Sequence, residues 1–296
     1  MNCMVARSSP ACAKHRSADA AMGSFSTFDY IAGADARQRL DIVRPTAAVD
    51  LHTAVLVLHG GAFLHGDRAV VHPRCQALAA RGITAIAVGY RLLDTAPWPA
   101  QLDDVRAALR WTYRHAGEFA VDTGRIVLQG HSAGAQLALL GADTLANDST
   151  PVASGVIAYY PPAAMSLAPS AGDMPAQMLL GPDATAEAAA GASPLTHIDA
   201  RFPPTALVHG AADRFVSPVA SLRLFEALAV AGVRSELHIF AGQDHEFDMT
   251  PRYGDATTDL AVAFLRAEVA ERELVAKEII DANPFASMPA PGADPA

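Results

Sequence analysis

Cysteine is scarce in this sequence: the 296 residues include three, Cys3, Cys12 and Cys75. The count is odd, and two of the three lie in the N-terminal stretch. This usage does not indicate a disulfide framework, and the absence of any Cys-x-x-Cys pair argues against a thiolate zinc site.

Long apolar runs and an excess of positive charge are also lacking. No apolar run approaches the roughly 18 residues that a membrane span requires, so none is expected. Asp and Glu number 31 against 22 Lys and Arg, a formal net charge of -9. An acidic surface repels phosphate backbones, which argues against a nucleic-acid partner. The N-terminus has no continuous apolar segment of the secretory kind, so we expect a cytoplasmic protein.

Apolar residues, by contrast, make up 51% of the chain, enough for one large core. Residues 1–24 are rich in Ala, Ser and Arg without a steady period, and this composition predicts a disordered leader. Residues 283–296 are rich in Pro and Ala and predict a flexible tail. We expect one domain between them, over residues 25–282.

Within that domain, short apolar runs alternate with helical patterns. Leu102, Val105 and Leu109, for example, step by three and four residues. Strands that alternate with helices predict an α/β fold with a mostly parallel sheet covered on both faces. Two further runs ahead of these predict an antiparallel pair at one edge, which brings the total to about eight strands. The predicted buried strands are residues 54–58, 83–88, 125–129, 155–160, 205–209 and 235–240; the edge pair is 25–31 and 38–43.

The segment Gly130-His-Ser-Ala-Gly134 matches the G-x-S-x-G pattern of a nucleophile elbow. A nucleophilic serine must project from a sharp strand-to-helix turn, and small neighbours let the chain pass close to itself there. The pattern alone is weak, but here it follows the predicted strand 125–129 and precedes the helical run 135–140. This context identifies Ser132 as the candidate nucleophile.

A glycine pair follows the predicted strand 54–58, in His59-Gly-Gly-Ala-Phe63. Such a loop leaves backbone amides unshielded, and they can point at the oxygen that becomes negative during acyl transfer. We expect the amides of Gly61 and Ala62, with that of Ala133 after the serine, to form an oxyanion hole. His59 is expected to brace the loop.

The chain contains 11 histidines, and chain order selects among them. Where such an elbow carries a triad, the serine is followed by an acid and then by a histidine. His245 lies just past the last predicted strand, and Asp213 follows the strand 205–209. A carboxylate there can hold the imidazole tautomer and stabilise the imidazolium. The triad is therefore predicted as Ser132, Asp213 and His245.

Other candidates for these roles fit less well. His209 and His238 lie within strands and are interpreted as core histidines. Asp244 is adjacent to the base and poorly placed to reach its ring. Asp199 is a further rival acid, and Asp248 is expected to be solvated.

Residues 163–198 form an insert rich in Met and Leu, including Met165 and Leu179. Flexible apolar side chains suit a lid over a substrate pocket, although a small satellite core would have the same composition. Phe63, Tyr160 and Phe247 flank the motifs and are also candidate pocket residues.

These motifs together resemble the esterase/lipase branch of the α/β-hydrolase superfamily. The similarity runs from about Arg39 to about Leu265 and is greatest to the feruloyl-esterase-like (BD-FAE) and hormone-sensitive-lipase-like groups. Ala62 stands where lipase-like members often have Gly, and Gly-His-Ser stands where many have Gly-Asp-Ser. Both differences favour the feruloyl-esterase-like side. The resemblance implies hydrolysis of carboxylic esters by a serine hydrolase without a cofactor. From the candidate pocket residues we expect the substrate to be a small-molecule ester with a short-to-medium acyl group.

Three alternatives stay open from the sequence. The same triad could hydrolyse an amide, a formamide or a lactone. A ligand-binding protein on this fold that has lost catalysis would be expected to have a broken triad. Metal-dependent hydrolysis through His59, His65 and His72 would use a spacing that fits no recognised zinc pattern.

The amphipathic C-terminal segment up to Ile280 could pack against a second copy, which leaves a homodimer open.

Overall fold

The structure is a computed structural model that describes residues 23–33, 35–142 and 152–283. Residues 1–22 of the predicted leader and 284–296 of the predicted tail lie outside the described residues, as do Cys3 and Cys12. Within the described ranges, no helix has the length and apolar character needed to cross a membrane.

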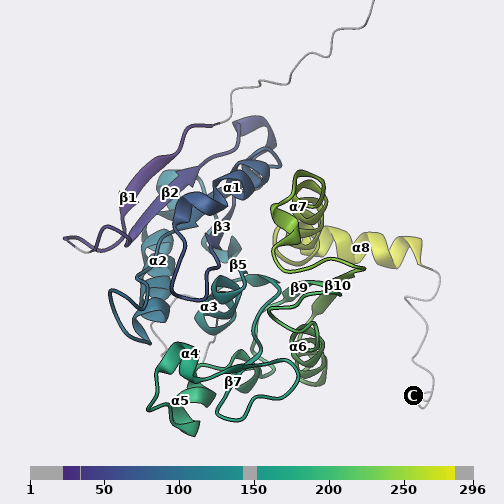
Figure 1. The fold of residues 1–296 in the computed structure, drawn as a ribbon. Helices are drawn as coiled ribbons and strands as arrows, with labels where there is room; N and C mark the ends of the chain where they lie inside the picture. The colour runs from purple at the N-terminus through teal and green to yellow at the C-terminus, as the bar shows by residue number, and fades with distance from the viewer. Residues whose placement is uncertain (1–22, 34, 143–151, 284–296) are drawn as a thin grey trace, which may run out of the picture.

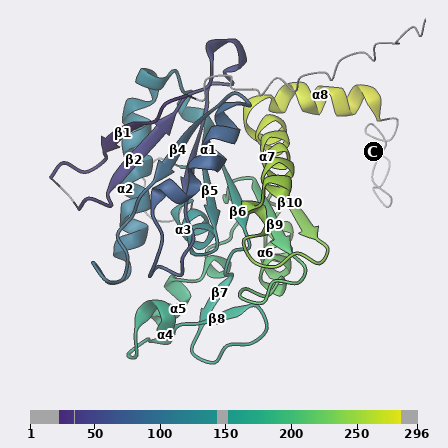
Figure 2. The same ribbon diagram turned by 45° about the horizontal axis from the view of Figure 1, so that its top comes forward.

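Eight strands form one twisted sheet in the order β1-β2-β4-β3-β5-β6-β9-β10 (Figure 2). β1 and β4 both pair with β2 in antiparallel fashion, and the other neighbours are parallel. The predicted α/β class, the number of strands and the antiparallel edge are confirmed. The strands are β1 (Ser26–Asp29), β2 (Arg39–Val43), β3 (Thr53–Leu58), β4 (Ile83–Val88), β5 (Ile126–His131), β6 (Gly155–Tyr159), β9 (Thr205–Gly210) and β10 (Ser235–Phe240).

Helices cover both faces of this sheet (Figure 1). β3 shows why its sequence is apolar throughout. Leu56 packs into the core on one face, beside side chains of α2, α3 and α6, and Val57 packs into the core on the other, beside α1 and α7. Successive side chains of a strand point to opposite faces, so a strand between two helical layers needs apolar residues at every position. These helices are α1 (His72–Ala79), α2 (Ala100–His115), α3 (Ala133–Gly141), α6 (Val219–Val230) and α7 (Pro251–Leu265).

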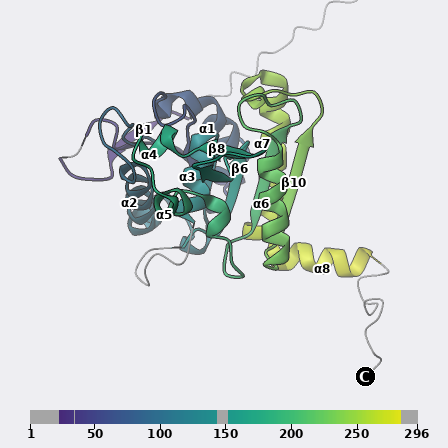
Figure 3. The ribbon, with the colours of Figure 1, turned by 60° about the horizontal axis from the view of Figure 1, so that its bottom comes forward.

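β10 departs from the expectation of a strand buried on both faces. Among the described strands it pairs with β9 alone and forms an edge of the sheet, so its residues are partly or fully exposed along its whole length. Beyond α7, the short π-helix Arg266–Ala270 leads into α8 (Arg272–Ala282), which extends away from the sheet (Figure 3). Its apolar residues Leu274, Ile279 and Ile280 are exposed.

The predicted insert 163–198 forms a small layer of its own at one end of the molecule (Figure 1). β7 (Ala164–Ser166) and β8 (Asp173–Pro175) pair in parallel, and the short helices α4 (Gln177–Leu180) and α5 (Ala186–Gly191) follow. The insert contributes walls to the pocket described below, where the loops that follow the parallel strands meet.

Candidate active site

Ser132 stands between β5 and α3, and its backbone angles (φ 53°, ψ -117°) are strained for a residue other than glycine. The turn is tight because the chain passes close to itself. A Cβ atom added at Gly134 would lie 2.3 Å from the His59 carbonyl oxygen, so only glycine fits. The serine is half-buried and projects from the elbow that the sequence predicted.

The structure brings the side chains of Ser132, His245 and Asp213 together from three separate loops. His245 Nε2 lies 3.0 Å from Ser132 Oγ, and His245 Nδ1 lies 2.6 Å from Asp213 Oδ2. A carboxylate can only accept, so Nδ1 carries the imidazole proton and Nε2 is left to accept a proton from the serine hydroxyl. This arrangement can activate a nucleophile.

Asp213 is held as an ionised carboxylate by several donors. Its Oδ1 accepts the backbone N–H groups of Phe215 at 2.8 Å and Val216 at 2.9 Å. Burial by itself would raise the pKa of Asp213. The side chains of His209 and His245 and the Val216 amide outweigh burial and keep that pKa well below its usual range. The negative charge that orients His245 is therefore secured by the fold.

His209 supports Asp213 from behind and is fully buried. Its Nε2 lies 2.9 Å from the Val216 carbonyl oxygen and 3.3 Å from Asp213 Oδ2, and its Nδ1 lies 2.7 Å from Ser221 Oγ. The carbonyl requires a proton on Nε2, so Nδ1 accepts from the serine. His209 is a buried histidine with its hydrogen bonds satisfied, as predicted, but its contact with Asp213 was not foreseen.

The glycine loop after β3 lies beside the serine in a left-handed conformation. Gly61, Ala62 and Phe63 have φ values of 111°, 53° and 64°. Among the described residues, none accepts a hydrogen bond from the amide of Gly61 or Ala62, and both Ala62 and Ala133 line the pocket that contains Ser132. The Ala133 amide belongs to the first turn of α3, where N–H groups have no partner within the helix.

His59 stabilises the conformation of this glycine loop. It is 1% exposed, its Nδ1 lies 2.7 Å from the Gly60 carbonyl oxygen, and its ring stacks on Tyr90 at 4.2 Å between centroids. Burial is the main cause that lowers the pKa of His59 to about 4. His59 is therefore a neutral brace near pH 7, as expected.

A narrow pocket of about 40 Å³ opens at Ser132. Since about 10–15 Å³ of such space holds one water, it has room for about three methyl-sized groups. Phe63, Met165 and Leu179 line it, as predicted. The full lining is Ala62, Phe63, Ser132, Ala133, Gln136, Pro162, Met165, Met174, Met178, Leu179 and Val216.

Tyr160 and Phe247, which the sequence placed in the pocket, do not line it. Tyr160 is fully buried beneath the histidine, with its ring 4.4 Å from that of His245, and its hydroxyl donates to Asp248 Oδ1 at 2.7 Å. Phe247 packs among aromatic rings beside Tyr253. Both side chains point into the core, so the pocket prediction for them is corrected.

The prediction for Asp248 is also wrong. Asp248 was expected to be solvated, but it is 3% exposed. Its Oδ2 accepts from Arg74 Nη2 at 2.8 Å and lies 3.3 Å from His131 Nε2. Burial would raise the pKa of Asp248, but the neighbouring His131, the Arg74 guanidinium and the Tyr160 hydroxyl outweigh burial and keep that pKa well below its usual range. A buried ion pair thus links α1, the elbow residue before Ser132 and the loop that carries His245.

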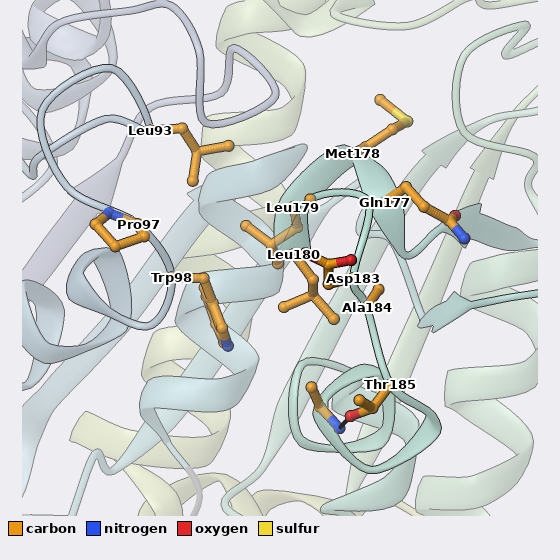
Figure 4. Close-up of a pocket in the computed structure, with 12 residues that line it drawn as sticks. Leu93, Pro97, Trp98, Gln177, Met178, Leu179, Leu180, Asp183, Ala184 and Thr185 are labelled. Carbon is orange, nitrogen blue, oxygen red and sulfur yellow. Dashed lines mark hydrogen bonds between the residues drawn. The ribbon is translucent and has the colours of Figure 1, made fainter.

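A groove of about 450 Å³ lies on the other side of α4 (Figure 4). Leu93, Pro97 and Trp98 face Leu179 and Leu180 across it. Met178 and Leu179 line both the groove and the pocket at Ser132. Side chains of α4 therefore form the wall between the two spaces.

The histidines of the metal-dependent alternative do not come together. His59 faces Gly60, His65 is exposed and His72 pairs with Asp41 at 2.9 Å. The described part of the chain contains no group of three or more His, Cys, Asp or Glu side chains that could hold a metal ion.

The sheet order, the elbow and the convergent loops define the α/β-hydrolase class. A family model for BD-FAE matches residues 40–228, which is well over half of the chain. The chain belongs to the BD-FAE family.

Known esterases are similar to it in sequence. Esterase LipI of Mycobacterium tuberculosis is 32% identical over 202 residues, 62% of this chain and 62% of LipI. The probable carboxylic ester hydrolase LipM of the same organism is 31% identical over 230 residues, 71% of this chain and 53% of LipM. The chain thus spans less than two thirds of the length of these relatives.

A solved structure of esterase 2 from Thermogutta terrifontis with bound butyrate covers 85% of this chain and 97% of its own, with a TM-score of 0.70 and 29% identity. The same enzyme has been solved phosphonylated by sarin, with a TM-score of 0.71. The fold is that of these esterases.

Proposed function

We propose that this protein is a serine carboxylesterase in which Ser132 is the nucleophile, His245 the general base and Asp213 the residue that orients the base. The observation that carries the proposal is the continuous hydrogen-bonded chain from Ser132 Oγ to His245 Nε2 at 3.0 Å and from His245 Nδ1 to Asp213 Oδ2 at 2.6 Å. Membership of the BD-FAE family and the similarity to LipI and to the Thermogutta esterase support it.

The reaction follows from the proton positions. His245 Nε2 takes the hydroxyl proton as Ser132 Oγ attacks the ester carbonyl, and the resulting imidazolium is stabilised by Asp213. In this mechanism the amides of Gly61, Ala62 and Ala133 donate to the oxyanion. His245 then gives its proton to the leaving alcohol, and the same residue activates a water that releases the acid.

The narrow pocket supports a short acyl group within the short-to-medium range. Its volume of about 40 Å³ suits an acetyl to butyryl chain. The Thermogutta esterase was solved with butyrate and with propionate, which are acids of this size. The groove beyond α4 offers the alcohol portion about 450 Å³.

The test is labelling with a fluorophosphonate probe and hydrolysis of p-nitrophenyl butyrate by the full chain. The wild-type protein should be labelled, and Ser132→Ala should lose labelling and roughly 10⁴-fold or more in kcat. Ser154→Ala is a matched control, because the Ser154 hydroxyl donates to the Gly124 carbonyl near the opposite ends of the strands. Full activity of Ser132→Ala would refute the assignment. Faster turnover of formamides, amides or lactones than of esters would mean that the substrate belongs to one of those classes and is not a carboxylic ester.

A further inference from the structure

One polar side chain lies in the otherwise apolar pocket beside Ser132. Gln136 belongs to α3, one helical turn beyond the serine, and its backbone N–H donates to the Ser132 carbonyl at 3.1 Å. Its side chain is fully buried and lines the pocket. Among the pocket-lining residues in the described part of the chain, Ser132 is the only other one with a hydroxyl, amide or charged side chain.

The orientation of the Gln136 amide is fixed. Its Nε2 donates to the Ala192 carbonyl oxygen at 2.7 Å. A carbonyl only accepts, so the nitrogen must face Ala192 and the Oε1 atom must face elsewhere. None of the described residues donates to this Oε1, although it is buried. A buried acceptor without a donor is costly, and a bound group that supplies a donor would remove that cost.

The residues around Gln136 favour an uncharged donor on the bound substrate. The described residues that line the pocket include no Asp, Glu, Lys, Arg or His. An ammonium group would find no counter-charge there, and a carboxylate would face Gln136 Oε1 and be repelled. A hydroxyl group can donate to Oε1 without bringing a charge into an apolar site.

We propose that Gln136 Oε1 is a specificity determinant that accepts a hydrogen bond from a hydroxyl on the acyl chain of the substrate. The preferred substrates are then esters of short hydroxy acids. This inference rests on the proposed esterase function and names its substrate class. The small pocket limits the acyl chain to a few carbons, so hydroxyls on the second and third carbons are the ones to test.

The experiment compares matched ethyl esters with the full chain by acid release at constant pH. The pairs are propionate with 2-hydroxypropionate and butyrate with 3-hydroxybutyrate, each enantiomer separately. We expect at least one hydroxy ester to exceed its parent in kcat/KM by about tenfold, the effect of one buried hydrogen bond to a neutral acceptor. The corresponding methoxy ester cannot donate and should lose that advantage. This comparison needs no variant.

Gln136→Met should reduce the ratio of hydroxy to parent ester to about one. Gln101→Met is the matched control. Gln101 is also buried, its Nε2 donates to the Ala96 carbonyl at 2.8 Å and its Oε1 has no donor among the described residues, but it does not line the pocket. That variant should keep the wild-type ratio, because general destabilisation lowers both substrates together.

Equal kcat/KM for hydroxy and parent esters in the wild-type protein would overturn the proposal and leave the esterase function standing. It would mean that water satisfies Gln136 Oε1. A preference for the methoxy ester, or a ratio unchanged in Gln136→Met, would also overturn it. If neither ester of any pair is hydrolysed, the esterase function fails first and the specificity fails with it. A hydroxyl that helps only on the alcohol side, in 2-hydroxyethyl butyrate, would contradict the acyl placement.

Discussion

Asp248 and Arg74 form a buried ion pair with 2.8 Å between Oδ2 and Nη2, although they are 174 positions apart in the chain. Arg74 belongs to α1, and Asp248 follows His245 by three residues. The guanidinium also donates to the hydroxyls of Thr257 and Thr258 in α7. The pair therefore fixes the loop that carries His245 against two helices of the same layer.

Removing one partner of this pair should destabilise the protein strongly. Asp248→Ala leaves the Arg74 charge buried without its carboxylate, and we expect the free energy of unfolding to fall by about 3–5 kcal/mol. Guanidinium denaturation followed by circular dichroism measures this. The control is Asp259→Ala, whose exposed carboxylate pairs with Arg81 at 2.7 Å and should cost at most about 1 kcal/mol. Equal losses in the two variants would mean that the buried pair does not hold the loop.

His59 predicts a pH dependence of stability. Its pKa is about 4 in the folded protein because of burial, against an ordinary value of 6.5. Between those values the unfolded state binds the proton and the folded state does not, so stability falls as the pH decreases from 6.5 to 4. The shift corresponds to about 3 kcal/mol. Unfolding measured at several pH values should show a shallower decline for His59→Gln than for the wild type; parallel curves would contradict this role.

Gly61→Ala should damage activity through the backbone of the proposed oxyanion loop. Gly61 has a φ of 111°, and an added Cβ would lie 2.2 Å from the His65 carbonyl oxygen, so the loop must shift. Misplacing an oxyanion donor costs about 10²–10³-fold in kcat. Gly117→Ala, where an added Cβ meets nothing within 4 Å, is the control for p-nitrophenyl butyrate hydrolysis. A Gly61→Ala variant with wild-type kcat would argue against oxyanion binding by this loop.

Local sequence pattern predicted the strands because burial between two helical layers imposes a pattern that can be read locally. In β3, for example, every side chain is buried. The elbow was equally legible, since the backbone at Ser132 requires small neighbours such as Gly134. Contacts between segments that are distant in the sequence could not be predicted in this way. Asp248 lies in the short 3-10 helix Phe247–Met249, within a polar connecting segment, and no residue near it in the sequence predicts that Arg74 will neutralise it.

The pocket illustrates the same limit. Phe247 lies two residues after His245 and Tyr160 directly follows β6, but position in the sequence does not fix the direction of a side chain. Gln136 was missed for the opposite reason: a glutamine in a helix carries no signal of its own. Its position one turn after the predicted nucleophile was the available clue, because residues four apart share a helix face.

The wall formed by α4 predicts how acyl-chain selectivity can be changed. Leu179 is 3% exposed and lines both the pocket at Ser132 and the groove of about 450 Å³. Leu179→Ala should connect the pocket at Ser132 with the groove. An octanoate ester should then gain at least about tenfold in kcat/KM relative to the butyrate ester, which is the scale on which one apolar contact discriminates between substrates. Rates for p-nitrophenyl esters from C2 to C10 measure the shift.

Leu180→Ala is the matched control for this change, because Leu180 lies in the same helix and lines the groove without lining the pocket. Both variants lose the same atoms from α4, so a shift in chain length common to both would reflect loosening of the helix and not removal of the wall. An unchanged chain-length profile in Leu179→Ala would mean that other pocket residues, such as Met165 or Phe63, limit the acyl chain. Rapid hydrolysis of long-chain esters by the wild-type protein would refute the short acyl pocket itself.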